Sequence, residues 1–546
     1  MRVPTDRYLD FRGVLAACQA LAEHPLVHLQ TLGHTDHGRP LLLLEVGHDV
    51  QEKPALWLDG GTHAVEWTGV SAALATVDSW LRRQDAGDAD LVGFFRDHAA
   101  FVMPCMSPDG YQAMHDGSPY LRSTLRPAPG GVRAGLAPHD IDGDGHIGWM
   151  RWRHPAGPWV PDVDEPLLMR PRTLDDPPDQ AFYVASEGRF LAWDGWRWVD
   201  APRQFGLDLN RNFPAHWSPF RMFGMDGGRF PGSAPESRAV LDAVAARPRI
   251  AAALSNHTYT GALLTQPYRA DSPLKTADIR LMKRLAENAV AGTGYRAIQV
   301  HPDFTYDPEQ PIRGVWADTL STTFGVPGYT LELWNPFGWA GVEVPEPASF
   351  FRDPDMDVIG ALLRTFRREG LVKDWRPFDH PQLGPVELGG VDYLHSVRNP
   401  PAALLPEECA RGVAVADRLR KALPRVEASV AVQGSGELRT VTLRLENQGF
   451  LPTSGLALAV ERGTVSPVTA TLSGAAPVRG SREVELSHLG GWGQAADGLA
   501  GNPLYPGLGT SGQRCEHVWT VRPAGPIDVR WDAGRGGCGV HRVGED

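Results

Sequence analysis

The chain has 546 residues, 42% of them hydrophobic and 22% charged, a composition typical of a folded globular protein with more than one domain. Its formal net charge of −12 argues against nucleic acid or an anionic membrane as a partner, because both require a basic face. No apolar run approaches the length of a membrane span. The first ten residues lack the basic start and apolar core of a signal peptide, which predicts a cytoplasmic protein.

The elements predicted up to about Arg376 alternate between apolar runs and helical patterns. The predicted strands are Pro40–Val46, Ala55–Asp59, Ala99–Pro104, Ile250–Ser255, Ala297–Val300 and Gly328–Leu333. The predicted helices are Phe11–His24, Trp67–Arg83, Pro235–Ala246, Pro273–Gly292 (capped by Ser272), Gly314–Phe324 and Pro354–Glu369. This alternation predicts an α/β sheet covered by helices on both faces.

A long segment, about Pro127 to Gln204, interrupts this alternation. Its many tryptophans need burial, so we expect an ordered insertion in which they form a core rather than a sugar-stacking surface. Within it, Asp140, Asp142 and Asp144 resemble the start of a calcium loop. The twelfth position of that loop is Arg151 instead of an acidic ligand. We therefore favour a turn that orders the insertion over a Ca²⁺ site.

The C-terminal part of the chain follows a Pro-rich stretch, Arg376–Pro406, and a predicted helix, Glu407–Leu423. Beyond Pro424 the hydrophobic pattern changes to period two, which predicts a β-sandwich. Its predicted strands are Val426–Val432, Val441–Leu445, Leu456–Glu461, Arg482–Leu486, His517–Val521 and Ile527–Trp531. We predict a catalytic domain over residues 1–400, a linker helix over 401–423 and an accessory domain over 424–546. An accessory, stabilising role is favoured over ligand or partner binding, because no site is visible there.

The five cysteines are few, odd in number and without paired ligand spacing, at positions 18, 105, 409, 515 and 538. Neither a disulfide framework nor a thiolate zinc site is expected. A pairing of Cys515 with Cys538 is left open by the sequence.

Polar residues with metal-ligand character follow the predicted strands, where an α/β sheet places its ligands. His63 and Glu66, three residues apart, follow one strand and can reach one cation, although a surface pair at a helix start has the same spacing. His257 follows a second strand, and Glu332 lies inside an apolar strand, where it needs a partner. Two His and one carboxylate predict a catalytic zinc site with water in the fourth position, and a second Glu is the proton acceptor such a water needs.

Together these residues resemble the zinc carboxypeptidases of the carboxypeptidase A type. The resemblance covers about the first 375 residues and rests on motifs in the family's order: His63-Ala64-Val65-Glu66-Trp67, Ser107-Pro108-Asp109-Gly110-Tyr111, Asp208-Leu209-Asn210-Arg211-Asn212, His257-Thr258-Tyr259 and Tyr329-Thr330-Leu331-Glu332-Leu333. It implies a mixed eight-stranded sheet flanked by helices, and one Zn²⁺ per chain.

The resemblance also implies roles for single residues. His63, Glu66 and His257 resemble the zinc ligands, and Glu332 resembles the general base that activates the zinc-bound water. Arg122, preferred over its neighbour Arg126, resembles the arginine that stabilises the oxyanion. The residues implied to bind substrate are Asn210, Arg211 and Tyr259. Asn210 and Arg211 would hold a free α-carboxylate, to which the guanidinium of Arg211 can donate two hydrogen bonds.

The chain departs from the family at several positions. Val65 stands where the family often has Arg, and the family's mobile Tyr aligns near Gln310, with Tyr306 as a weak substitute. The pocket-floor position falls near Ala317, which gives no support for basic side chains. Arg269 falls at another pocket position and would favour an acidic side chain, unless it is a solvated surface residue.

The sequence therefore predicts a zinc-dependent metallocarboxypeptidase that hydrolyses the C-terminal bond of a peptide with a free carboxylate. One alternative is an amidase or deacylase of the same fold, acting on cell-wall peptides or N-acylated amino acids. A second is a non-catalytic binding protein, against which the complete set of ligands, base and Arg122 argues.

Overall fold

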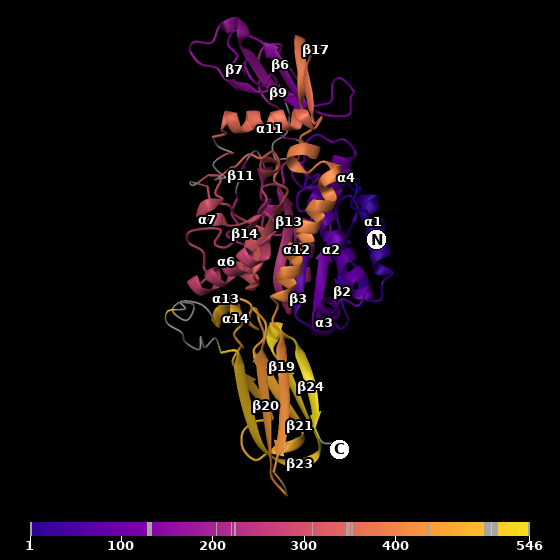
Figure 1. Ribbon diagram of the computed structural model, residues 1–546, viewed down its shortest axis with the longest axis vertical. Helices are drawn as coiled ribbons and strands as arrows, with labels where there is room; N and C mark the ends of the chain where they lie inside the picture. The colour runs from indigo at the N-terminus through magenta and orange to yellow at the C-terminus, as the bar shows by residue number, and fades with distance from the viewer. Residues whose placement is uncertain are drawn as a thin grey trace.

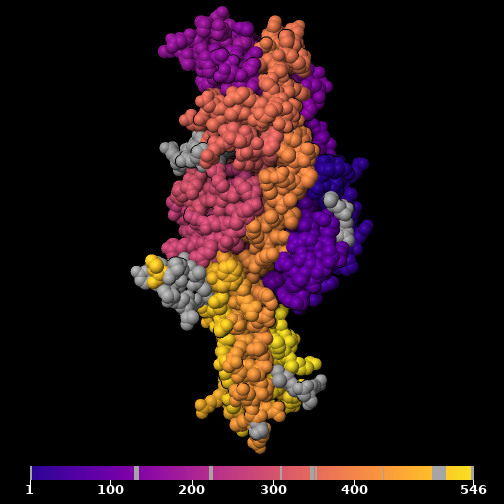
Figure 2. Space-filling model, viewed as in Figure 1, coloured from indigo at the N-terminus to yellow at the C-terminus, as the bar shows by residue number. Residues whose placement is uncertain are grey.

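The computed structural model describes residues 3–127, 134–203, 205–219, 221–222, 225–307, 310–344, 350, 353–434, 436–495, 504 and 512–543. The molecule is elongated, with a central α/β body and a β-sheet unit at each end (Figure 1). Figure 2 shows the C-terminal unit, orange to yellow, as a narrow projection from the central body. Among the described residues, no helix combines the length and the apolar character that a membrane crossing needs.

The central body is built on a mixed eight-stranded sheet in the order β1-β2-β4-β3-β13-β16-β14-β15. The strands β4, β3, β13 and β16 are parallel, whereas β1, β2 and β14 pair antiparallel to their neighbours toward the centre. Their bounds are β1 Val27–His34, β2 Pro40–Val46, β3 Ala55–Gly60, β4 Ala99–Met103, β13 Ile250–Thr258, β14 Ala262–Thr265, β15 Arg296–Gln299 and β16 Gly328–Leu333. The predicted mixed sheet is confirmed.

Both faces of this sheet are buried because alternate apolar residues point to opposite sides. Leu42, Leu44, Leu56 and Leu58 join one core, and the residues between them, such as Leu43 and Trp57, join the other. Helices on the first face are α1 Phe11–Ala22, α2 Trp67–Asp85, α3 Ala89–Asp97, α4 Pro108–His115, α6 Thr276–Val290 and α12 Leu405–Lys421. The second core is closed by α5 Pro235–Ala245, α8 Trp316–Thr319 and the π-helical turn η3 Leu320–Phe324.

Most predicted elements of the central body are present, with corrections at the edges. The strands β1 and β14 and the helices α3 and α4 were not predicted. Helix α6 begins at Thr276 with Lys275 extended before it, so the cap predicted at Ser272 is wrong. The helix predicted as a linker, now α12, packs along α2 and α6 with its apolar side buried in the sheet's core.

The insertion does not stand alone, because its strands pair with a later part of the chain. One sheet has the order β17-β18-β6-β9-β7-β8, and a two-stranded ribbon joins β5 to β10. Their bounds are β5 Gly135–Pro138, β6 Trp149–Arg153, β7 Trp159–Pro161, β8 Met169–Pro171, β9 Phe182–Ser186, β10 Gly188–Leu191, β17 Val372–His380 and β18 Gly384–Val391. Helix α11, Met356–Arg368, lies between this unit and the central body (Figure 1).

The tryptophans of the insertion mostly pack as predicted. Trp152 is buried, and Trp193 and Trp198 pack against the same core. Trp196 is the exception, since 82% of it is exposed, and the prediction of a core position for it is wrong. The predicted Asp/Gly turn is present: the Asp140 carboxylate accepts hydrogen bonds from the backbone of Gly143 and Gly145 at 2.7 and 2.8 Å.

The C-terminal unit is one six-stranded sheet in the order β19-β20-β23-β21-β22, with β24 paired to β23. The sheet curls around a single core until β19 contacts β24. Its bounds are β19 Val426–Gln433, β20 Arg439–Asn447, β21 Val468–Pro477, β22 Glu483–Leu486, β23 Arg514–Asp532 and β24 Cys538–Val543. The strands predicted at 517–521 and 527–531 are both parts of β23. Cys515 and Cys538 are both free thiols.

The strand predicted at Leu456–Glu461 is wrong, because these residues form helix α13, Ala457–Arg462. The carboxylate of Asp278 accepts the backbone N–H of Ala457 at the helix start, and Ala459 packs directly on Gly325. Docking on the central body thus overrides the local pattern. The remaining short elements are η1 Pro178–Gln180, η2 Leu209–Arg211, β11 Arg221–Met222, β12 Met225–Asp226, α7 Val300–Asp303, α9 Pro336–Trp339, η4 Leu394–Arg398, η5 Ala402–Leu404, α14 Trp492–Ala495 and η7 Gly534–Gly536.

Candidate metal centre and active site

The residues predicted as metal ligands meet at the carboxyl ends of the central strands. His63 follows β3, Glu66 immediately precedes α2, and His257 is the last residue but one of β13. Glu332 of β16 is the register partner of His257 on the neighbouring strand. All three candidate ligands are buried, with 1–2% of each exposed.

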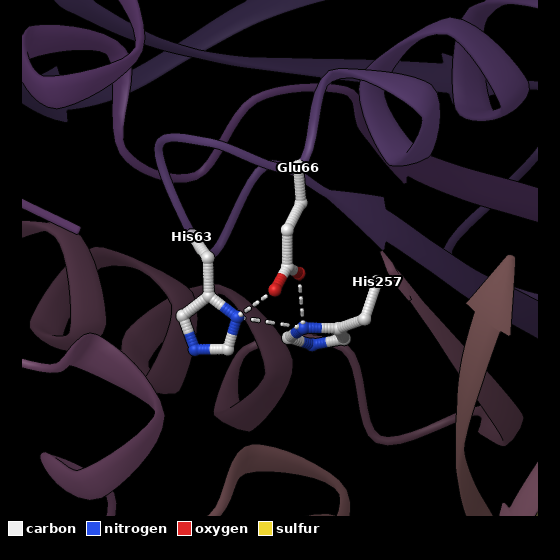
Figure 3. Close-up of side chains that lie close together, drawn as sticks. All are labelled: His63, Glu66 and His257. Atoms are coloured by element: carbon white, nitrogen blue, oxygen red, sulfur yellow. Dashed lines mark hydrogen bonds and ion pairs between the residues drawn. The ribbon is translucent and has the colours of Figure 1, made fainter. Parts of the chain in front are cut away.

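The ligand atoms converge on one point (Figure 3). The Nδ1 atom of His63 lies 2.9 Å from one Glu66 oxygen, and the Nδ1 atom of His257 lies 2.8 Å from the other. The two Nδ1 atoms are 3.0 Å apart. Ligand atoms around a tetrahedral zinc lie about 3.3 Å from one another. The donor set, two imidazoles and a carboxylate, therefore fits Zn²⁺ in both chemistry and spacing.

Each imidazole is held by its second nitrogen, which leaves Nδ1 for the metal. His63 Nε2 lies 3.2 Å from the Asp208 carboxylate. His257 Nε2 lies 3.1 Å from the hydroxyl of Ser255, which in turn donates to Asp59. Sequence reasoning did not assign roles to Asp208, which stands within a motif that carried the resemblance, or to Ser255, which precedes His257 by two residues.

Glu66 and Glu332 occupy different electrostatic environments although they are neighbours. Burial raises the pKa of Glu66, but the charges of His63 and His257 outweigh it and hold that pKa well below its usual range. Burial raises the pKa of Glu332 to about 7, opposed by the charges of His257 and Arg122. Such divergence is typical of sites in which one carboxylate stays ionised and the other exchanges a proton.

Arg122 lies beside the candidate ligands and Arg126 does not. The Arg122 guanidinium donates to Glu66 at 3.1 Å and to Asp208 at 3.2 Å. Arg126 instead pairs with Asp36 and Glu236. The preference for Arg122 thus agrees with its position in the structure.

Asn210 and Arg211 form a 3-10 turn beside Asp208. The side-chain oxygen of Asn210 accepts the backbone N–H of Trp316 at 2.9 Å, which fixes the turn against α8. Arg211 donates to the carbonyl of Asn210 at 2.7 Å, and its charge contributes to the lowered pKa of Asp208. The turn therefore places a guanidinium on the Asp208 side of the ligands.

Tyrosines line other parts of the site. The pKa of Tyr306 is raised to about 12 by burial and by Glu332, while Arg122 and Arg211 oppose the rise. Tyr306 is thus within electrostatic range of Glu332, Arg122 and Arg211, and its role as a substitute for the mobile tyrosine stays a prediction. The guanidinium carbon of Arg398 lies over the ring of Tyr259, 5.0 Å from the centre of that ring.

The residues predicted for side-chain selection lie apart from the ligands. Ala317 and Asp318 are buried, and the amide of Gln266 donates to Asp318 at 2.8 Å. Burial raises the pKa of Asp318 to about 6. Arg269 is paired with the exposed Asp271 at 2.8 and 3.0 Å, so the structure does not bring it into the metal group.

Arg398 is a residue of the site that sequence reasoning missed. It ends the turn η4 and donates to Glu66 at 3.4 Å and to the carbonyl of Thr258 at 2.9 Å. No sequence signal marks it, because it follows the insertion-paired strands and belongs to none of the motifs.

The fold and this constellation define a zinc-peptidase type of protein. The sequence profile of the zinc carboxypeptidase family matches residues 14–157 and 176–338, more than half of the chain. The chain belongs to the zinc carboxypeptidase family. Residues 423–543 match a second family, described only as a domain of unknown function.

Single relatives share only part of this chain. Carboxypeptidase B of Astacus astacus is 32% identical over 108 residues, 19% of this chain and 34% of the relative. Human carboxypeptidase A1 is 28% identical over 124 residues, 22% of this chain and 28% of the relative. The chain thus spans about a third of the length of the curated relatives it matches. The solved structure of thrombin-activatable fibrinolysis inhibitor aligns with 76% of this chain and 74% of its own, at 16% identity and a TM-score of 0.44.

Proposed function

We propose that the protein is a zinc-dependent metallocarboxypeptidase that removes the C-terminal residue of a peptide with a free carboxylate. The observation that carries the proposal is the convergence of His63, His257 and Glu66 on one point, with the separately tuned Glu332 on the adjacent strand. Family membership supports the same reaction. One Zn²⁺ bound there would supply Lewis acidity and acidify a water molecule.

The chain's own residues would bind and orient the substrate as follows. Arg211 and Asn210 would hold the terminal carboxylate, for which a guanidinium fork is suited. Arg122, fixed by Asp208, would stabilise negative charge that develops on the scissile carbonyl oxygen. Tyr306 and Tyr259 would cover the bound peptide.

Glu332 would carry the proton. In its ionised form it would accept a proton from the attacking water and pass it to the nitrogen of the leaving amino acid. A carboxyl group with a pKa near 7 is well matched to both steps, because it holds and releases a proton with little cost near neutral pH.

Three further expectations from the sequence stay predictions. These are the domain boundaries at residues 400 and 423, the contribution of Arg269 to side-chain selection and the assignment of Asp140, Asp142 and Asp144 to a turn without calcium. An amidase or deacylase acting on cell-wall peptides or N-acylated amino acids stays the second candidate, because Val65 departs from the family.

Peptides that differ only in a free or amidated C-terminus test the proposal. We expect hydrolysis of the free peptide to exceed that of the amide by at least about tenfold in kcat/KM, since the amide leaves the Arg211 fork unpaired. Arg211→Met should reduce this preference, while Arg238→Gln on α5, away from the site, serves as control. Equal cleavage of both peptides would favour the amidase instead.

A further inference from the structure

Arg398 is placed in the active site by a segment that lies beyond the match to the zinc carboxypeptidase family, which ends at residue 338. Its neighbour Asn399 is fully buried and fixes this segment to the loop of the candidate metal ligands. The Asn399 amide donates to the Val65 carbonyl at 2.8 Å, and its oxygen accepts the backbone N–H and the hydroxyl of Thr68 at 3.0 and 3.1 Å. The position of Arg398 is therefore built into the site.

The nitrogen atoms of the Arg398 guanidinium have different hydrogen-bond partners. Nη1 donates to the Thr258 carbonyl and contacts Glu66. On the other side, Nη2 reaches only tyrosine hydroxyls, Tyr393 at 3.2 Å and Tyr120 at 3.5 Å, and the buried Nε has no hydrogen-bond partner among the described residues. The edge formed by Nε and Nη2 is one that suits a carboxylate bidentately.

Within the described part of the chain, the charge of Arg398 has no carboxylate of its own. Among the residues that the structure describes, the only carboxylate in contact with it is Glu66, at 3.4 Å. The same oxygen of Glu66 already accepts from Arg122 at 3.1 Å, and Glu66 is a candidate metal ligand. A largely buried cation is costly without an anionic partner. The exposed Arg203, 5.4 Å above the ring of Tyr120, adds further positive charge here.

Arg398 contacts the candidate ligand Glu66, whereas Arg211 acts on Asp208, the residue that contacts the other candidate ligand His63. The contacts run from Arg398 to Glu66, then to His63, then to Asp208, whose pKa Arg211 helps to lower. If Arg211 holds the terminal carboxylate, as the proposed function states, the residue before the scissile bond extends toward Arg398.

We propose that Arg398 binds an acidic side chain on the penultimate residue of the substrate, so that the enzyme prefers peptides ending in Glu-Xaa or Asp-Xaa. This inference rests on the proposed carboxypeptidase function. The substrate carboxylate would take the Nε–Nη2 edge and supply the negative charge that the described residues around Arg398 do not.

The test uses benzoyl-Glu-Xaa and benzoyl-Gln-Xaa, where Xaa is the C-terminal residue that the zinc-loaded wild-type protein removes fastest. The two substrates have nearly the same shape and differ in one charge. We expect kcat/KM to favour the Glu peptide by at least about tenfold in the wild type. In Arg398→Gln this ratio should fall to within about twofold of one, because the charge that distinguishes the two peptides is lost.

Arg238→Gln is the matched control and should keep the wild-type ratio. A wild-type ratio of one or below would overturn the inference, and this result does not depend on the folding of any variant. Equal loss of both peptides in Arg398→Gln would also overturn it, because it would show a purely structural or catalytic role. If neither peptide is hydrolysed by the wild type, the proposed function itself fails.

Discussion

At the scale of single residues, the site separates its carboxylates by environment. Glu66 faces both imidazoles and is held ionised, whereas Glu332, on the neighbouring strand, is partly buried without such close positive partners. The positions of His63, Glu66, His257 and Glu332 after or inside apolar strands, together with the family resemblance, were sufficient to predict this group. Arg398 was not predictable, since nothing local reveals that a distant turn is fixed to the ligand loop by Asn399.

The pH dependence of the reaction follows from Glu332. Its ionised form is the base, so kcat/KM should fall as pH drops through the pKa of this group, by about tenfold per pH unit. Burial raises that pKa from 4.5 to about 7, and a bound metal cation would lower it again, so the apparent value should lie between these limits. Kinetics across this range, with zinc content measured at each pH, provide the check. Constant kcat/KM from pH 7 to pH 4.5 would contradict the assignment of Glu332.

At the scale of elements, the strand ends determine where the chemistry occurs. The apolar strands β3, β13 and β16 were predictable because they are buried on both faces and read as continuous apolar runs. The edge strand β1 is less regular and half-exposed, so its sequence carries a weaker signal. Helix α13 was predicted as a strand because its sequence is an apolar run typical of a strand. It folds as a helix because it docks on α6 and Gly325.

Close packing of α2 on β13 positions Glu66, and Gly69 makes it possible. A Cβ atom on Gly69 would lie 2.6 Å from the carbonyl oxygen of Asn256. We therefore expect Gly69→Ala to lower the free energy of unfolding by about 1–3 kcal/mol. Gly93→Ala in α3, where a Cβ meets nothing within 4 Å, should instead raise it by roughly 0.5–1 kcal/mol.

Denaturant unfolding of both variants, under identical zinc loading, measures the difference. Equal stability of the two alanine variants would show that α2 and β13 can separate at no cost.

At the scale of the whole molecule, the added units are joined closely to the central body. The insertion shares a sheet with β17 and β18, and the chain then returns through Arg398 to the active site. The C-terminal unit docks on the opposite end: Arg249 pairs with Asp532 at 2.7 Å, and Arg535 donates to the Phe324 carbonyl at 2.6 Å. The sequence predicted that these units exist, but their pairing depends on contacts between segments hundreds of residues apart, which no local pattern encodes.

Zinc content and turnover, measured together on the same preparations, test the central claim most directly. We predict that the wild-type protein binds one Zn²⁺ per chain at the site formed by His63, Glu66 and His257 and hydrolyses a peptide with a free C-terminus. Glu332→Gln should keep the zinc and lose about two to four orders of magnitude in kcat, whereas His257→Ala should lose both. A wild-type protein that binds less than one equivalent after zinc addition, or a Glu332→Gln variant that stays active, would contradict the account.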